Sequence, residues 1–231
     1  MSEVASSARQ YSSPPGSEKQ PQPGRVLLSP HETHPAHAFA DPDHSAADLH
    51  DLRQMQARLR LTLRRVSADD GQVDRIYDPQ GLRTLTGLTV VGFRGLCRPD
   101  ISTALQEEVT RVDTALGAQL ERDQSRMILG YSTRQLGPHD WLNLVVLRNE
   151  AGLHYWHQSA LHRYAAQELS PQLYQGIRLH TGKLPQGLRG PLHLSVTKYY
   201  ALGSAPWQAQ RNYGGNASRS GQQGVGASGS P

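Results

Sequence analysis

The segment from Pro99 to Leu120 constrains the fold of this chain most, because it predicts one long amphipathic helix. Its apolar residues are spaced four, four, three, four and four positions apart, which places them in a single stripe along a helix. Pro99 and Asp100 suit the first turn of that helix. The residues of the stripe are Ile101, Leu105, Val109, Val112, Leu116 and Leu120.

Strands surround this helix in the sequence. The apolar run LTVVGFRGL (88–96) precedes it, and RMILGYSTR (126–134) and WLNLVVLR (141–148) follow it with a loop of hairpin length between them. HYWHQSALHRY (154–164) predicts a second helix that ends near Pro171, and PLHLSVTKYYAL (191–202) predicts the last strand. This order predicts an α+β fold with the ferredoxin-like βαββαβ split motif, in which both helices cover one face of an antiparallel sheet.

The other face of this sheet also needs cover. WLNLVVL is apolar on both alternating sets of residues, and LTVVGF is nearly so, which indicates strands buried on two sides. Either a dimer or an extra layer from residues 46–85 would supply the second side. We expect the dimer, in which two chains form a dimeric α+β barrel.

The ends of the chain differ in composition from this domain, which we place at residues 86–202. Residues 1–45 are rich in Ser, Pro, Gly, Gln and His, and residues 203–231 form a Gly- and Ser-rich tail. Such segments cannot bury enough surface to offset their ordering entropy, so we expect a disordered arm and a disordered tail.

Three internal segments are less clear. Residues 46–85 fit both helical and alternating spacing, and we expect a helix that runs into a strand near Leu59. A short helical turn is expected around residues 172–177. The Gly- and Pro-containing stretch 180–191 predicts a connection between elements.

Composition excludes several classes of protein. Cys97 is the single cysteine, so no intramolecular disulfide can form, and the absence of an 18-residue apolar window argues against a membrane partner. We therefore expect a cytoplasmic protein. The net charge of +4 is spread along the chain, which argues against nucleic acid as a partner, although the Arg-rich stretch 58–65 keeps a nucleic-acid-associated role as a third hypothesis.

The second predicted helix carries the candidate site. On a regular helical wheel, His157 falls within the apolar face that includes Trp156 and Tyr164, whereas His154 and His162 fall outside it. His157 is therefore either a core histidine with a hydrogen-bond partner or a pocket residue with a perturbed pKa. No carboxylate or cysteine accompanies these histidines at metal-ligand spacing, so no metal site is expected here.

A second group of histidines lies in the N-terminal arm, in the stretch HETHPAHAFADPDH. Closely spaced imidazoles bind Zn, Cu or Ni weakly. A flexible segment loses conformational entropy on binding, so we interpret the affinity of this stretch as adventitious. The histidines are His31, His34, His37 and His44.

The stretch WLNLVVLRNEAGLHYWHQSALHRYAAQ (141–167) resembles the antibiotic-biosynthesis monooxygenase-like, dimeric α+β barrel superfamily. The likeness consists of an apolar strand, an acidic turn, and a helix with the spacing of Trp156, Ser159 and His162. The strands VVGFRGL and MILGYS are similar to the first two strands of monooxygenase-like members. The resemblance covers roughly residues 86–202.

This resemblance implies a small-molecule monooxygenase-like enzyme or a ligand-binding protein, with an aromatic pocket between helices and sheet. It implies a catalytic role for His157 and substrate contacts from Trp156, Tyr164, Asn143 and His162. In a cofactor-independent mechanism, a pocket base takes a proton from a phenolic or enolic substrate, and the carbanion then reacts with oxygen.

The heme-degrading branch of the superfamily is disfavoured, and no cofactor is expected. The positions of its iron-ligating His and of its strand-end Asn hold Ala166 and Gly92 in this chain. The alternative from another class is a non-enzymatic dimeric scaffold or interaction protein.

Overall fold

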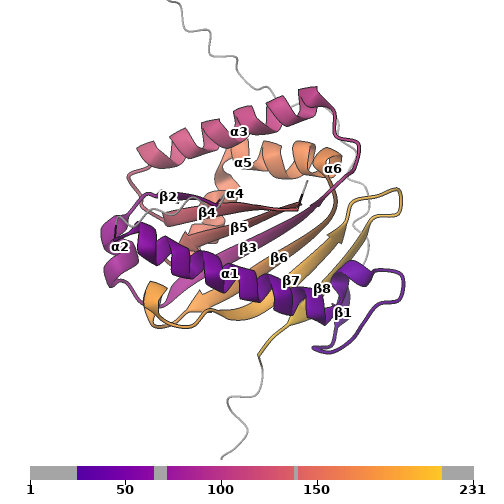
Figure 1. Cartoon of the computed structure of the whole chain (residues 1–231), viewed down its shortest axis with the longest axis horizontal. Helices are drawn as coiled ribbons and strands as arrows, with labels where there is room; N and C mark the ends of the chain where they lie inside the picture. Colours follow the sequence, from indigo (N-terminus) through magenta and orange to yellow (C-terminus); the bar gives the residue numbers. More distant parts are fainter. Residues whose placement is uncertain (1–24, 65–71, 138–139, 215–231) are drawn as a thin grey trace, which may run out of the picture.

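The structure is a computed structural model, and it describes residues 25–64, 72–137 and 140–214. It has an α+β fold, with one mixed eight-stranded sheet and helices on both of its faces (Figure 1). The strand order is β1-β8-β7-β6-β3-β5-β4-β2. β1 pairs with β8 in parallel, and the other neighbouring pairs among these strands are antiparallel.

The elements have the following bounds. The strands are β1 (Val26–Leu28), β2 (Gln72–Ile76), β3 (Leu88–Cys97), β4 (Ile128–Leu136), β5 (Asp140–Leu147), β6 (Tyr174–Leu184), β7 (His193–Ala201) and β8 (Trp207–Asn212). The helices are α1 (Pro42–Thr62), α2 (Pro79–Thr84), α3 (Thr103–Arg122), α4 (Ala151–Gln158), α5 (Ala160–Tyr164) and α6 (Ser170–Leu173). Two 3-10 turns, η1 (Ala38–Ala40) and η3 (Gly187–Arg189), and one π-helical turn, η2 (Ala165–Leu169), complete the list.

The predicted amphipathic helix is confirmed as α3, although it begins later than Pro99 and Asp100 suggested. Ser102 is its N-cap, and the Ser102 side chain accepts a hydrogen bond from the backbone N–H of Leu105. This contact satisfies one of the free N–H groups of the first turn. The four strands predicted at 88–96, 126–134, 141–148 and 191–202 are confirmed as β3, β4, β5 and β7.

The helical turn expected around residues 172–177 and the connection expected over 180–191 were wrong where they overlap β6, which occupies Tyr174–Leu184 next to β3. Polar residues concealed this strand in the sequence. Arg178 and His180 occupy one of its alternating sets and are 4 % and 0 % exposed, since buried partners satisfy both of them. The central elements follow one another in the sequence as β3, α3, β4, β5, α4–α6 and β6. In the sheet, their four strands are neighbours in the order β6-β3-β5-β4.

The disorder predicted for residues 1–45 and 203–231 extended too far into the chain. Residues 25–45 contain β1, η1 and the first turn of α1, and Trp207–Asn212 forms β8. Contacts between these two regions order both of them, and such contacts leave no trace in local composition. Residues 1–24 and 215–231 lie outside the described residues, so for them disorder stays a prediction.

Residues 46–85 resolve into α1, β2 and α2, and the strand expected near Leu59 is absent from the described residues of this segment. The helical spacing prevails, because it buries Leu52, Met55 and Leu59 against the sheet at 1 %, 0 % and 0 % exposure. Leu61, which belongs only to the alternating pattern, is 42 % exposed.

Helix α1 supplies the second layer that the apolar strands required, so the extra layer is present within one chain (Figure 1). It packs closely on β3, where a Cβ at Gly92 would lie 2.5 Å from Leu52 Cδ1. Helices α3 to α6 lie on the opposite face (Figure 1). The sheet face that a partner sheet would cover in a dimeric barrel is therefore occupied by α1.

Substitution Leu52→Ala should lower the free energy of unfolding by about 2–5 kcal/mol, because it removes a buried side chain and leaves a cavity beside Gly92. Chemical denaturation measures this loss. Leu61→Ala on the same helix is the matched control and should change stability by less than about 0.5 kcal/mol. Equal losses in both variants would contradict the placement of α1.

Candidate functional site

The two faces of the sheet are covered to different extents. On the α1 side, the central residues Val90, Leu142 and Leu144 are at most 1 % exposed. On the side of α3 to α6, the neighbouring residues Phe93 and Leu179 are only half-buried. The helical layer on this side, which we call the helix-side layer, therefore leaves apolar surface of the central strands in contact with solvent.

Asn143 on β5 lies on this helix-side face. The Thr133 hydroxyl on β4 donates to Asn143 Oδ1 at 2.6 Å, which holds the orientation of the amide. No described residue accepts a hydrogen bond from Asn143 Nδ2, and the side chain is half-buried. Nδ2 is therefore a donor that a ligand on this face can use.

Tyr131 lies on the same face of β4 as Thr133. Burial raises the pKa of its phenol, and the nearby charge of Asp113 raises it further. Tyr131 therefore stays neutral over the whole physiological range.

The residues that carry the superfamily resemblance meet at a break in the helix-side layer. Ser159 ends α4 and caps α5, since its Oγ accepts a hydrogen bond from the backbone N–H of His162 at 3.2 Å. The Ser159 hydroxyl also donates to Gln119 Oε1 on α3. The rings of Trp156 and His162 lie 4.7 Å apart across this break.

The electrostatic environment of His162 favours the neutral ring. Burial, and secondly the charge of His157, lower the pKa of His162 to about 4. The Nδ1 atom of His162 is buried and has no hydrogen-bond partner among the described residues. His162 is therefore a neutral imidazole at pH 7.

His157 was predicted at the centre of the apolar face, and this prediction was wrong because His157 is exposed. The helical wheel assumed one continuous helix, but the chain leaves the helical conformation at Ser159, where ψ is 121°. Tyr164 is half-buried, and its hydroxyl donates to Glu108 Oε1 on α3 at 3.0 Å. Of the five predicted site residues, the structure thus brings Trp156, His157 and His162 together, whereas Asn143 and Tyr164 make separate contacts.

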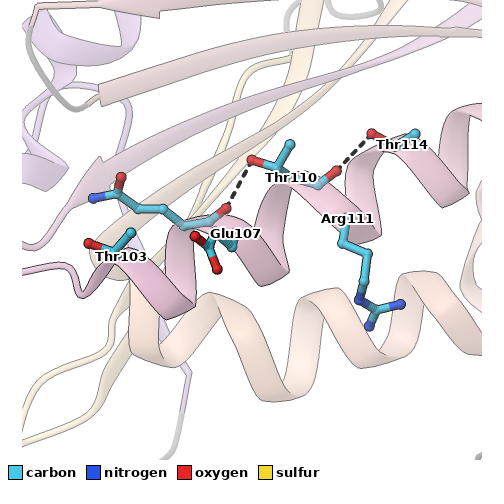
Figure 2. A pocket seen from close by; sticks show the side chains of 6 residues that line it. Thr103, Glu107, Thr110, Arg111 and Thr114 are labelled. Atoms are coloured by element: carbon cyan, nitrogen blue, oxygen red, sulfur yellow. Dashed lines mark hydrogen bonds between the residues drawn. The ribbon is translucent and has the colours of Figure 1, made fainter.

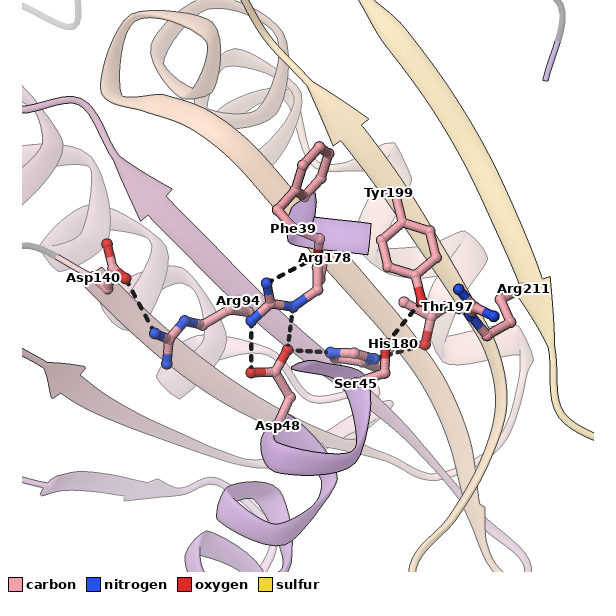
Figure 3. Close-up of polar contacts among 10 residues, drawn as sticks. All are labelled: Phe39, Ser45, Asp48, Arg94, Asp140, Arg178, His180, Thr197, Tyr199 and Arg211. Carbon is pink, nitrogen blue, oxygen red and sulfur yellow. Dashed lines mark hydrogen bonds and ion pairs between the residues drawn. The ribbon is translucent and has the colours of Figure 1, made fainter. Parts of the chain in front are cut away.

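A buried polar network on the α1 side was not predicted (Figure 3). Asp48 of α1 accepts hydrogen bonds from Arg178 Nε at 2.5 Å and Nη2 at 2.9 Å, and its Oδ2 lies 3.0 Å from His180 Nε2. His180 Nδ1 lies 2.8 Å from the hydroxyl of Thr197. Sequence reasoning missed this network, because its residues come from α1, β6 and β7 and the burial of Arg178 and His180 appears only in the structure.

The network has the order of an acid–base–hydroxyl relay, Asp48–His180–Thr197, but it lacks access for a substrate. Asp48 is 2 % exposed, and His180 and Thr197 are both 0 % exposed. Burial disfavours the carboxylate of Asp48, yet hydrogen bonds from His180 and Arg178 outweigh burial and lower its pKa to about 2. We therefore assign these residues to the support of α1.

The same network continues toward the chain ends (Figure 3). The Tyr199 hydroxyl hydrogen-bonds to Ser45 at 2.8 Å and accepts from Arg211 Nε at 3.1 Å. Arg211 is 0 % exposed, and it also donates to the backbone carbonyls of three residues of the N-terminal region. They are Ser29, Glu32 and Ala40.

Part of the histidine-rich stretch packs against Trp207 of β8. His37 stacks on Trp207 at 4.0 Å, and the ring of His34 lies 5.0 Å from the same indole. His31 and His44 are exposed or nearly so on the surface. Within the described ranges, no group of three or more His, Cys, Asp or Glu residues could hold a metal ion.

Two hollows on the surface of the described residues are large enough to consider as ligand sites. One, of about 540 Å³, follows the outer side of α3 (Figure 2). There the hydroxyls of Thr110 and Thr114 donate to carbonyls of their own helix at 2.9 Å, so they offer no free donor to a ligand. The residues lining it are Thr103, Gln106, Glu107, Thr110, Arg111 and Thr114.

The second hollow, of about 710 Å³, lies at the end of β3. It contains Asp51, Cys97 and the ion pair between Arg94 and Asp140, in which Nη2 of Arg94 lies 3.1 Å from Oδ2 of Asp140. Burial, and secondly Asp140, raise the pKa of the Cys97 thiol to about 11, so Cys97 is not a nucleophile at neutral pH. The opposite charges of this hollow do not select a ligand class.

Comparison of the chain with family models, with curated proteins and with solved structures finds no match. Among the helices of the described residues, none is both long and apolar enough to cross a membrane.

Substitution Asp48→Asn should lower the free energy of unfolding by about 3–5 kcal/mol, because it leaves the Arg178 guanidinium buried without its counter-charge. Denaturation at pH 7 measures this loss. Asp140→Asn is the matched control, since Asp140 is 30 % exposed in its ion pair with Arg94 and should cost less than about 1 kcal/mol. Similar losses in both variants would contradict the structural role of Asp48.

Asp48 also predicts a dependence of stability on pH. Its folded pKa of about 2 lies below the ordinary value of 3.8, so its contribution is complete above about pH 4 and is lost as pH falls through about 2. Denaturation curves recorded between pH 5 and 2 should show a steeper loss for the wild type than for Asp48→Asn. Parallel slopes would show that Asp48 is not the group responsible.

Proposed function

We propose that this protein binds a small aromatic or otherwise apolar molecule between the helix-side layer and the sheet. The observation that supports this most is the incomplete burial of Phe93 and Leu179 on that face, beside fully buried residues on the α1 face of the same strands. Apolar surface that a domain leaves uncovered between layers is typical of a ligand site.

Two polar groups could orient such a ligand. Asn143 Nδ2 is a free donor on β5, and His162 is a neutral imidazole at the break in the helix-side layer. A few polar groups placed among apolar walls determine the orientation of a ligand in a site of this kind. A ligand that carries a hydroxyl or carbonyl oxygen on an aromatic ring fits this pattern.

The resemblance to the monooxygenase-like superfamily is consistent with this proposal. The spatial order β6-β3-β5-β4, with helices after β3 and β5, is the order of a ferredoxin-like split motif, and we propose that these elements form one. β1, β8, β7 and β2 then extend this core at its two edges.

Binding is better supported than monooxygenase catalysis. A general base works best with a pKa near the operating pH, and His162, with a pKa near 4, is a weak base. His157 is exposed and is not enclosed with the apolar face. We therefore propose ligand binding as the function, with cofactor-independent oxygenation as an activity to be tested on the bound ligand.

The structure also bears on the expected homodimer and on the nucleic-acid hypothesis. A homodimer remains a proposal, but it would have to use a surface other than the face that α1 covers. The nucleic-acid hypothesis is weakened, because Arg60 donates to the carbonyl of Arg189 and Arg58 lies 3.8 Å from Asp74. These arginines of the 58–65 stretch support the fold.

Titration with 1-naphthol, followed by amide chemical shifts, tests this function. We expect saturable binding of one molecule per chain, with the largest shifts at Phe93, Asn143 and Leu179. Asn143→Ala should weaken binding about fivefold to tenfold, which corresponds to one hydrogen bond of about 1 kcal/mol.

Thr110→Ala, in the hollow on α3, is the matched control and should leave the affinity unchanged. Shifts that map to α3 or to the hollow beside Arg94 would contradict the proposed site. Oxygen uptake in the presence of 1-naphthol, measured on the same samples, decides whether binding leads to oxygenation.

A further inference from the structure

The helix-side layer is interrupted at the joint between α4 and α5. α4 ends at Gln158, Ser159 has an extended backbone, and α5 spans only Ala160–Tyr164 before the π-helical turn η2. Such short helical segments have little stability of their own, so tertiary contacts hold them in place. The contacts at this joint therefore decide whether α5 and η2 stay packed against α3.

His162 makes the central contact at the joint. Its ring lies 4.7 Å from Trp156 and 6.0 Å from His157, and the two imidazole planes differ by 18°. Nδ1 is buried without a hydrogen-bond partner among the described residues. A neutral ring can leave a lone pair there, whereas an imidazolium would bury an N–H without an acceptor, which costs far more.

The surrounding charges offer no compensation for a proton on His162. From α4, His157 faces it, and a second positive charge there would repel the first. From α3, Glu108 is engaged by Arg111 and Tyr164, and on α5 itself Arg163 binds the carbonyl of Gln158.

The nearby sheet and η2 supply no counter-charge either. Tyr131 of β4 is a neutral phenol, and Glu168 of η2 is exposed. Among the described residues, no carboxylate forms an ion pair or hydrogen bond with the His162 ring. The closed joint therefore accommodates His162 only in its neutral form.

We propose that the joint between α4 and α5 is a pH-sensitive latch, which neutral His162 keeps closed and protonation of His162 opens. Opening brings the His162 ring into water, where the proton is solvated. It also moves α5 and η2 away from α3, against which they pack. Repulsion between charged His157 and His162 favours the open state further. Where the proposed function holds, this opening changes the helix-side layer beside the ligand face and weakens ligand binding in acid.

The direction of the pH dependence follows from the two states. In the open state the ring is solvated, with an ordinary pKa near 6.5, whereas in the closed state the pKa is about 4. The open state binds the proton more tightly, so acid favours it between these two values. Each unit of difference changes the ratio of open to closed protein tenfold, and the full effect is about two and a half orders of magnitude.

The test measures amide protection factors and histidine ring titrations by NMR, without ligand, between pH 7 and pH 4. We expect the protection of α5 and η2 to fall at least tenfold relative to α1 over this range. His162 should titrate well below 6.5, and His157→Gln should raise its pKa and reduce the loss of protection.

His162→Phe should abolish the pH dependence, because the ring volume remains and the titrating group is gone. His162→Gln serves the same purpose if the larger ring alters the fold at pH 7. His154→Gln is the matched control, since His154 is an exposed imidazole on α4 that hydrogen-bonds to Gln158. This control should behave as the wild type does.

Loss of protection that persists unchanged in both His162 variants would overturn the latch, as would protection of α5 that is independent of pH. Because no ligand is present, these outcomes do not depend on the proposed function. A latch that opens in a protein that fails to bind 1-naphthol would contradict the proposed function alone.

Discussion

The ion pair between Asp48 and Arg178 is the interaction on which the rest of the structure depends. It joins the first turns of α1 to the middle of β6, at a depth where either charge alone would be strongly destabilising. His180 and Thr197 satisfy the remaining polar atoms, so the network has no unpaired charge. With α1 held in this position, its apolar side chains cover the central strands on one face of the sheet.

Because α1 covers the central strands on one face of the sheet, the proposed ligand site lies on the other face. The helix-side layer is built from a long helix and several short segments, and it leaves part of the central strands accessible. Binding sites commonly lie on segments that a rigid scaffold supports, which is consistent with the proposed site on this face.

The regular, strongly periodic elements could be predicted from the sequence, and the elements that depend on distant partners could not. The apolar stripe of α3 and the apolar runs of β3, β4, β5 and β7 can be recognised from the local sequence pattern alone. β6 did not, because Arg178 and His180 are buried only through Asp48, 130 and 132 residues away. His157 was misplaced because the cap at Ser159 breaks a helix that the periodicity alone treats as continuous.

The parallel pairing of β1 with β8 has a consequence for how the chain folds. Val26 and Leu28 lie opposite Ala209 and Arg211, so the pair forms only after the chain as far as β8 has left the ribosome. Contacts of such long sequence separation slow folding, because the closure of the loop must precede the gain from the contact. The edge of β8 and the polar groups that meet Arg211 therefore stay unprotected until β1 and β8 have paired, which makes this pairing a late step of folding.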